Sequence, residues 1–108
     1  MHTALSKNGI PIRLTDERWL HITIGHPEMA NYYFEVLETV ENPEIVYYGN
    51  LDELLAVKSL PGSPDRYLVV VDKELADHTG VLVDGFIMTA YSTSKAKSLE
   101  KRQIAWQP

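Results

Sequence analysis

The stretch Met29-Ala-Asn-Tyr-Tyr-Phe-Glu-Val-Leu-Glu-Thr-Val40 decides how the rest of the chain must pack. Its apolar residues recur at the spacing of one helical face: Met29, Tyr33, Val36, Leu37 and Val40. Pro27 is a favoured first helical residue, and Asn42-Pro43 predicts the end of the helix. We therefore expect a helix over residues 27–42 that buries this face against the strands that follow it.

A shorter helix is predicted directly before this one. Thr15 is a suitable N-cap, and two acidic residues follow it in the first turn, where they complement the helix dipole. Trp19 and Ile22 should face the core, with Leu20 as a further candidate. Gly25 should end the helix, because glycine readily takes the left-handed conformation that is common at helix C-termini.

Five segments rich in β-branched, aromatic and aliphatic residues read as strands: Ile10 to Leu14, Ile45 to Tyr48, Glu53 to Lys58, Tyr67 to Lys73 and Gly85 to Thr93. The first should be an edge strand, because Pro11 has no N–H to give to a central ladder. Residues 60–65 predict a tight reversal, and residues 77–84 a longer connection. Residues 95–103 indicate either a short helix or a basic arm.

Helical segments followed by antiparallel strands predict an α+β domain. We expect two N-terminal helices packed on one face of a four- to five-stranded antiparallel sheet. At 108 residues the chain should form a single domain, residues 1–108. It has no cysteine, which excludes disulfides, thiolate metal sites and a cysteine nucleophile. No signal-peptide or membrane segment is evident, so a cytoplasmic location without membrane contact is expected.

Charge is distributed unevenly along the chain, whose net charge is −5. Residues 19–57 contain no Lys or Arg but many acidic side chains, whereas basic residues predominate from Ser94 onward. These could be ordinary solvated faces. Alternatively, the basic end faces RNA and the acidic flank is offered to a basic partner.

Several short motifs occur in a characteristic order: Arg18-Trp19-x-His21-Ile22, His26-Pro27-Glu28, Leu54-Leu-Ala-Val-Lys58, Tyr67-Leu-Val-Val-Val-x-Lys73 and Gly85-Phe-Ile-x-Thr89-Ala-Tyr91. This pattern, from Ile12 to Trp106, resembles the phage-type branch of the Barnase–EndoU–colicin–RelE (BECR) nuclease superfamily. The resemblance implies a small ribonuclease that uses no metal or cofactor. It also implies a toxin that a small antitoxin or immunity protein neutralises.

Metal-independent RNA cleavage needs proton transfer from the 2′-hydroxyl, charge stabilisation at phosphorus and a proton for the leaving oxygen. Histidine suits the proton transfers, and Lys or Arg suits the charge. The expected catalytic residues are His21, Lys58, Lys73, Thr89 and Tyr91. The expected substrate-binding residues are Arg18, His26 and Arg102. His21 is preferred as the proton-transferring group because it lies within a helix, whereas His26 precedes Pro27 and suits a junction. Strand alternation should place Thr89 and Tyr91 on one face together with Ile87.

Two other functions stay open. One is a binding or immunity-type module of the same fold without activity, which the acidic balance favours. The other is a metal enzyme using His21, His26 and Glu28, although this spacing matches no recognised ligand pattern. Cleavage that survives a chelator would separate the nuclease from the metal enzyme. The RNA target and the oligomeric state are left open.

Overall fold

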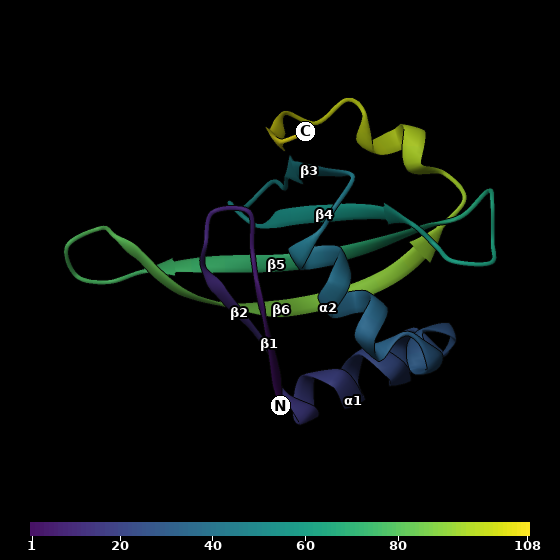
Figure 1. Cartoon of the computed structure of the whole chain (residues 1–108), viewed down its shortest axis with the longest axis horizontal. Helices are drawn as coiled ribbons and strands as arrows, with labels where there is room; N and C mark the ends of the chain where they lie inside the picture. The colour runs from purple at the N-terminus through teal and green to yellow at the C-terminus, as the bar shows by residue number, and fades with distance from the viewer.

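Seven strands and two α-helices make up the structure, a computed structural model that describes residues 1–108 (Figure 1). The strands are β1 His2–Leu5, β2 Pro11–Leu14, β3 Ile45–Tyr48, β4 Leu54–Ser59, β5 Tyr67–Ala76, β6 Leu82–Thr93 and β7 Ile104–Trp106. The helices are α1 Asp16–Gly25, α2 Tyr33–Glu41 and two 3-10 helices, η1 Pro27–Asn31 and η2 Ala96–Leu99. The class is α+β, as predicted.

All seven strands belong to one sheet, in the order β1-β2-β6-β5-β4-β3-β7. Neighbours are antiparallel except β2 and β6, which run parallel. The prediction of a four- to five-stranded antiparallel sheet after two N-terminal helices was therefore wrong. It missed β1 and β7, which are short and between them contain a single buried residue, Ala4, so they carry no apolar alternation.

β2 lies second in the sheet rather than at its edge, so the edge prediction was also wrong. Pro11 pairs with Leu5 of β1, and the pairing with β6 starts one residue later, at Ile12 and Gly85. Proline is thus confined to the first residue of the strand, where it is tolerated. The parallel direction joins segments that are far apart in the chain, and no local pattern in the sequence encodes it.

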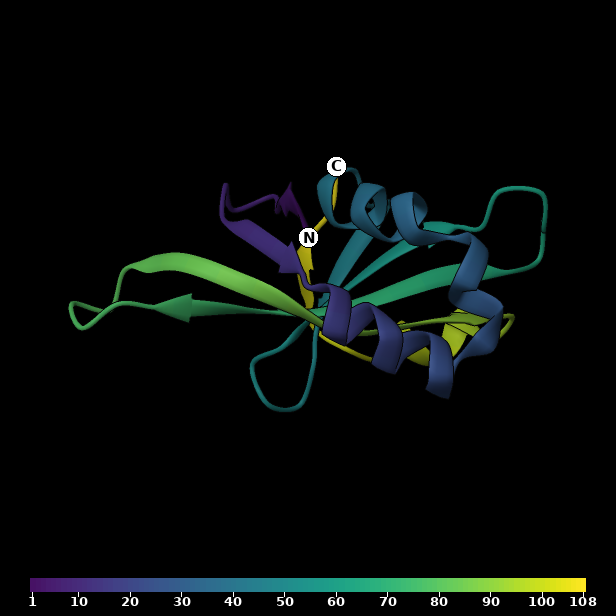
Figure 2. The same ribbon diagram turned by 90° about the horizontal axis from the view of Figure 1, so that it is seen from below.

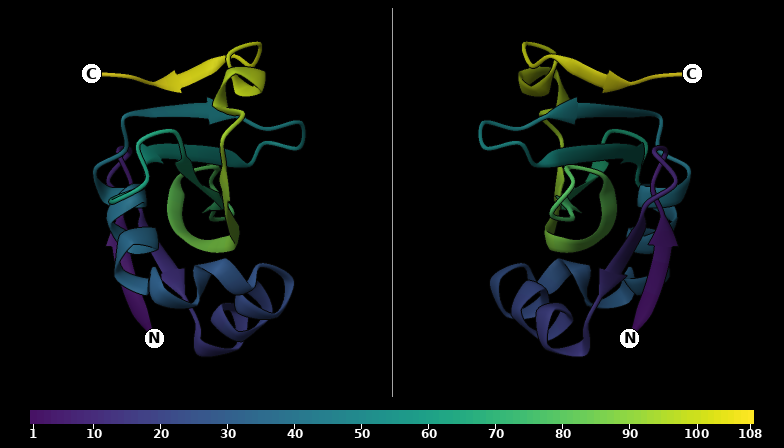
Figure 3. Two further views of the ribbon diagram at one scale, coloured as in Figure 1. Left: turned by 90° about the vertical axis from the view of Figure 1, so that its right-hand side faces the viewer. Right: turned by 90° about the vertical axis from the view of Figure 1, so that its left-hand side faces the viewer.

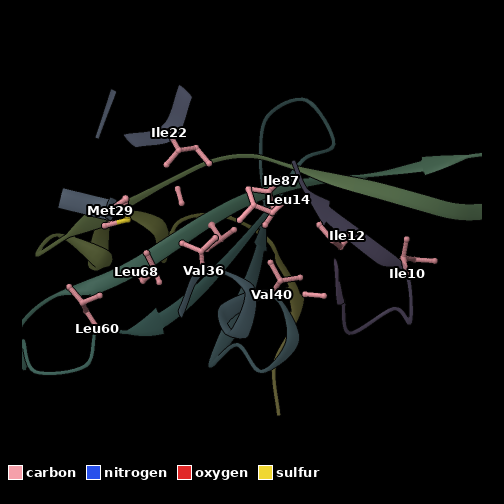
Figure 4. Close-up of a cluster of buried hydrophobic side chains, with 13 residues drawn as sticks. Ile10, Ile12, Leu14, Ile22, Met29, Val36, Val40, Leu60, Leu68 and Ile87 are labelled. Atoms are coloured by element: carbon pink, nitrogen blue, oxygen red, sulfur yellow. The ribbon is translucent and has the colours of Figure 1, made fainter. Parts of the chain in front are cut away.

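α1, η1 and α2 cover one face of the sheet and enclose the main core (Figure 2). Its largest buried side chains are Ile12, Leu14, Met29, Val36, Leu68 and Ile87 (Figure 4). The predicted burial of the apolar helical face is confirmed for Met29, Val36 and Val40, while Tyr33 and Leu37 are half-buried against the same cluster. No helix has the length and apolar character needed to cross a membrane.

Residues 27–42 form two helices rather than the single one predicted. η1 ends at Asn31, and Tyr32, with φ −121°, leaves the helical region before α2 begins. The predicted N-cap of α1 is confirmed, because the Thr15 hydroxyl accepts from the Arg18 N–H at 3.1 Å. α1 ends at Gly25 as expected, but without a positive φ. Instead, the His26 N–H donates to the carbonyl of Ile22 at 2.7 Å.

β5 and β6 form a long hairpin whose tip projects beyond the rest of the sheet (Figures 1 and 2). Both strands are longer than predicted, so the connection covers residues 77–81 only. Asp77 Oδ1 closes it by accepting from the Thr79 N–H at 2.8 Å and the Val81 N–H at 3.2 Å. Farther along, the register shifts between Val71 and Asp72.

The sheet face turned away from α1 and α2 carries a smaller core: Tyr47, Leu55, Val57, Val69 and Leu99. Leu99 belongs to η2, so the C-terminal segment folds over this face before β7 pairs with β3. Figure 3 shows this segment and α1 at opposite ends of the molecule. Of the two alternatives predicted for residues 95–103, the short helix is confirmed as η2, and the segment is not a free arm.

Candidate functional site

Three tyrosines lie on the sheet face that α1 and α2 leave uncovered: Tyr47 of β3, Tyr67 of β5 and Tyr91 of β6. Tyr91 pairs with Val69, which alternation places on the same face as Tyr67. Tyr47 is buried in the smaller core, and the other two are half-buried against it. We call this surface the tyrosine face.

A cavity of about 620 Å³ opens between the tyrosine face and residues 94–100. Tyr47 and Tyr67 form its aromatic wall, while Lys95 and Lys97 line it from the C-terminal segment. Its acidic lining residues are Glu44, Asp65 and Glu100. Aromatic rings beside ammonium groups can hold a base and its phosphate, and carboxylates can accept hydrogen bonds from exocyclic amino groups.

His26 lies against Tyr91, with ring centroids 5.9 Å apart and ring planes inclined by 35°. His26 occupies the junction between α1 and η1, where its φ of −134° lies outside the helical region, and η1 packs against β6. Its Nδ1 is 3.8 Å from Glu28 Oε2, and its side chain is 41 % exposed. A titratable ring therefore meets a phenol at a position that solvent can reach.

Burial raises the pKa of Tyr91, whereas the positive charge of Arg102 acts in the opposite direction. Tyr91 therefore keeps its proton at neutral pH and can donate it. Arg102 is held by Asn50, whose Oδ1 accepts from Nη1 at 2.9 Å, and a longer bond of 3.5 Å reaches the carbonyl of Tyr48. Because a guanidinium has five N–H donors, others remain for an anion. On the same face, burial and then Glu100 raise the pKa of Tyr47.

Tyr91 contacts the His26 ring and feels the charge of Arg102, whereas His21 and Arg18 make no such contact with Tyr91. His21 and Arg18 are both exposed on α1. The sequence-based preference was for His21, but of these two histidines it is His26 whose ring lies against a tyrosine of the sheet. Spacing could not show this, because the turn at His26 sets the direction of its ring.

The two lysines expected to stabilise phosphoryl charge lie on opposite faces of the sheet. Lys58 Nζ donates to Glu38 Oε1 of α2 at 2.9 Å, which puts Lys58 on the helix-covered face. Alternation along β5 puts Lys73 on the other face with Val71, but near the projecting hairpin and opposite Phe86. The two cannot act together on one phosphate.

Thr89 pairs with Val71 and lies on the same face as Tyr91, as predicted. Ile87 lies on the opposite face from Tyr91. The register shift leaves Met88 without a partner, so the Ile87 side chain points into the main core. The predicted shared face of Thr89 and Ile87 was therefore wrong. A bulge of one residue reverses the alternation of side chains between the two faces, and no feature of the sequence at residues 87–89 predicts it.

No group of three or more His, Asp or Glu side chains is placed to hold a metal ion. His21, His26 and Glu28 thus do not form the ligand set considered above. Comparison of the chain with protein-family models, with curated proteins and with solved structures finds no match.

Sequence reasoning missed Tyr47 and the two cavity lysines, Lys95 and Lys97. The basic character of the tail was visible in the sequence, but its position over the tyrosine face follows from η2 and β7. Tyr47 sits within an apolar strand, where an aromatic residue is most simply read as part of the core.

Proposed function

We propose that the protein is a small metal-independent endoribonuclease that cleaves single-stranded RNA at the tyrosine face. The observation that carries the proposal is the approach of His26 to Tyr91, which joins a proton acceptor and a proton donor from distant segments. The resemblance to BECR nucleases and the nearby cationic side chains support it. The geometry leads us to replace His21 by His26 in the reaction.

In this reaction the 2′-oxygen of a ribose attacks the adjacent phosphorus while its proton passes to the His26 imidazole. The bond from phosphorus to the 5′-oxygen breaks, and this oxygen takes the proton of the Tyr91 phenol. The products are a 2′,3′-cyclic phosphate and a 5′-hydroxyl. Proton exchange with solvent then returns His26 to its neutral form and Tyr91 to the phenol. Arg102 stabilises the charge that develops on the phosphoryl oxygens.

RNA flanking the cleaved bond would enter the cavity beside Tyr67. There Tyr47 and Tyr67 offer a surface for stacking a base, and Lys95 and Lys97 offer charge to its phosphate. Thr89 orients the strand on the same face. The net charge of −5 disfavours general attraction of nucleic acid, so binding depends on this local basic segment.

We further propose that the enzyme is the toxin of a toxin–antitoxin or phage toxin system and acts in the cytoplasm. The family resemblance supports this role. A small antitoxin or immunity protein would neutralise it, with basic residues meeting the acidic stretch from Glu28 to Glu53.

A second candidate is a binding module without activity. Its support is the apolar exposure on the two helices, where Leu20, Ile24 and Phe34 are 60 %, 71 % and 68 % exposed. Large exposed apolar side chains on a small protein are typical of an interaction surface.

The test is cleavage of single-stranded RNA by the purified protein in excess chelator, with product ends identified. His26→Ala should lower the rate by roughly 10²-fold or more, whereas the matched variant His21→Ala should retain it. Both variants are checked for an unchanged melting midpoint. A folded His26→Ala protein that cuts at the wild-type rate would exclude His26. Absence of cleavage by the wild type on any RNA, with or without ribosomes, would favour the binding module.

A further inference from the structure

Asp72 is an acidic residue buried inside the protein. It lies in β5 directly after four consecutive apolar residues and is only 2 % exposed. Its Oδ1 is the single buried side-chain oxygen or nitrogen of the structure without a hydrogen-bond partner. A buried carboxylate without a partner is strongly unfavourable, so such a group either stays protonated or requires a cation beside it.

Asp72 lines a small cavity of about 50 Å³ on the helix-covered side of the sheet. The cavity is bounded by the β1–β2 loop, by α2 and by β3, β4 and β7. Two of its lining residues are Lys7, from the loop, and Trp106, from β7. Because one water molecule occupies about 30 Å³ of the liquid, the space is enough for a single ammonium group.

Lys7 stands at the edge of this cavity. Its Nζ lies 4.9 Å from the centroid of the Trp106 ring, a cation–π contact. The loop around it is fixed, because Glu74 accepts from the Ser6 hydroxyl at 2.5 Å and from Asn8 Nδ2 at 2.8 Å. The backbone of Lys7 is therefore anchored, while its four-carbon side chain can still turn.

Few charged groups face Asp72. α2 contributes Val40, β4 contributes Leu54 and Ala56, and β6 contributes Ile87 as the paired residue, none of which titrates. β3 contributes the phenol of Tyr48, and β5 itself contributes Glu74. β7 contributes Trp106, and the loop contributes Lys7 as the only cation.

We infer that Asp72 and Lys7 form a proton-operated latch, in which the Lys7 ammonium leaves the Trp106 ring and enters the cavity when the Asp72 carboxyl loses its proton. Protonation of Asp72 reverses the movement. Burial, and secondarily Glu74, raise the pKa of Asp72 to about 7, so the latch operates near neutral pH. The charge of Lys7 supplies the partner that an ionised buried carboxylate requires.

The latch links two distant parts of the sheet. The order of strands puts β1 and β2 at one edge and β7 at the other, and the Lys7–Trp106 contact joins them. Withdrawal of Lys7 at higher pH removes this contact between the N-terminal hairpin and the C-terminal strand. This inference does not depend on the proposed nuclease activity.

The test uses the full chain with Trp19→Phe, which leaves Trp106 as the only tryptophan. The Trp106 emission should show a transition with its midpoint near pH 7, and Asp72→Asn should abolish it. Lys7→Met should remove most of the emission change. The matched control Lys97→Met, on the other side of the sheet, should leave it intact.

Carbon-13 NMR of the Asp72 carboxyl group follows the proton directly and does not depend on any Asp72 variant being folded. Loss of a nearby positive charge in Lys7→Met should raise the midpoint by about 1 unit or more. A midpoint and a Trp106 response in Lys7→Met equal to those of the wild type would overturn the latch, since water would then accommodate the ionised carboxylate. An Asp72 carboxyl that titrates near pH 4 would overturn it as well.

Discussion

The rings of His26 and Tyr91 lie 5.9 Å apart, although one residue ends a helix near the N-terminus and the other lies on the sixth strand. Neither ring is in the main core, and each has solvent on one side. Such a pair contributes little to a core, and it is the contact on which the proposed cleavage rests.

Tyr91→Phe isolates the role of the phenol. The phenylalanine ring keeps the contact with His26 and the packing against the smaller core that contains Val69, so stability should change little. If the hydroxyl supplies the proton to the leaving oxygen, the cleavage rate should fall by about 10²-fold. Single-turnover cleavage and thermal unfolding of the same preparation measure both quantities. Tyr48→Phe, which changes an exposed tyrosine of β3, serves as the control. A wild-type rate in Tyr91→Phe would remove the phenol from the reaction.

Met29→Ala tests the main core. Met29 is fully buried between η1 and the sheet, so its truncation leaves a cavity and should lower the free energy of unfolding by about 2–5 kcal/mol. Leu20→Ala, at a position 60 % exposed, should change it by less than about 0.5 kcal/mol. Urea unfolding of both variants gives the comparison. Equal effects would mean that the helices do not pack as described.

Gly85→Ala tests the close approach of β2, β5 and β6. A Cβ at Gly85 would lie 2.5 Å from Ile12 Cδ1 and 2.7 Å from the carbonyl oxygen of Lys73, and the latter is backbone that cannot turn away. We expect a loss of about 1–3 kcal/mol in stability. Gly25→Ala is the matched control, because a Cβ there meets nothing within 4 Å and φ is not positive. That variant should be neutral or slightly stabilising.

Asp72 should make the stability depend on pH. The folded protein holds the Asp72 proton up to about pH 7, whereas the unfolded chain releases it near the ordinary value of 3.8. The unfolded state therefore binds fewer protons between these values, and the free energy of unfolding falls as pH rises from about 4 to about 7. The contribution is at most about 4 kcal/mol.

Asp72→Asn removes this titration. Its free energy of unfolding should vary less than that of the wild type from pH 4 to pH 7 and should exceed the wild-type value at pH 8. Urea unfolding at several pH values gives the slope of the free energy of unfolding against pH for the variant and for the wild type. Parallel slopes for the two proteins would show that Asp72 titrates alike in the folded and unfolded chains.

Much of the local structure was determined by the sequence alone. The N-cap at Thr15, the end of α1 at Gly25 and the burial of Met29, Val36 and Val40 follow from propensities and periodicity that act over a few residues. The strand Ile45–Tyr48 and the reversal after Leu60 are set by the same short-range physics, whereas β5 and β6 extend farther toward their shared turn than their apolar residues indicate. For this reason the α+β class could be predicted.

The tertiary structure alone decided what depends on distant pairing. The parallel approach of β2 to β6 arises from segments far apart in the chain, and the irregularity at Asp72 turns Ile87 to the opposite side from Thr89. The candidate site depends on the same long-range geometry. Lys58 and Lys73 look equivalent as basic strand ends, yet the sheet separates them, while it brings Tyr91 to His26. Periodicity fixes the side of an element on which a residue lies, but only the packed sheet determines which residues from different elements meet.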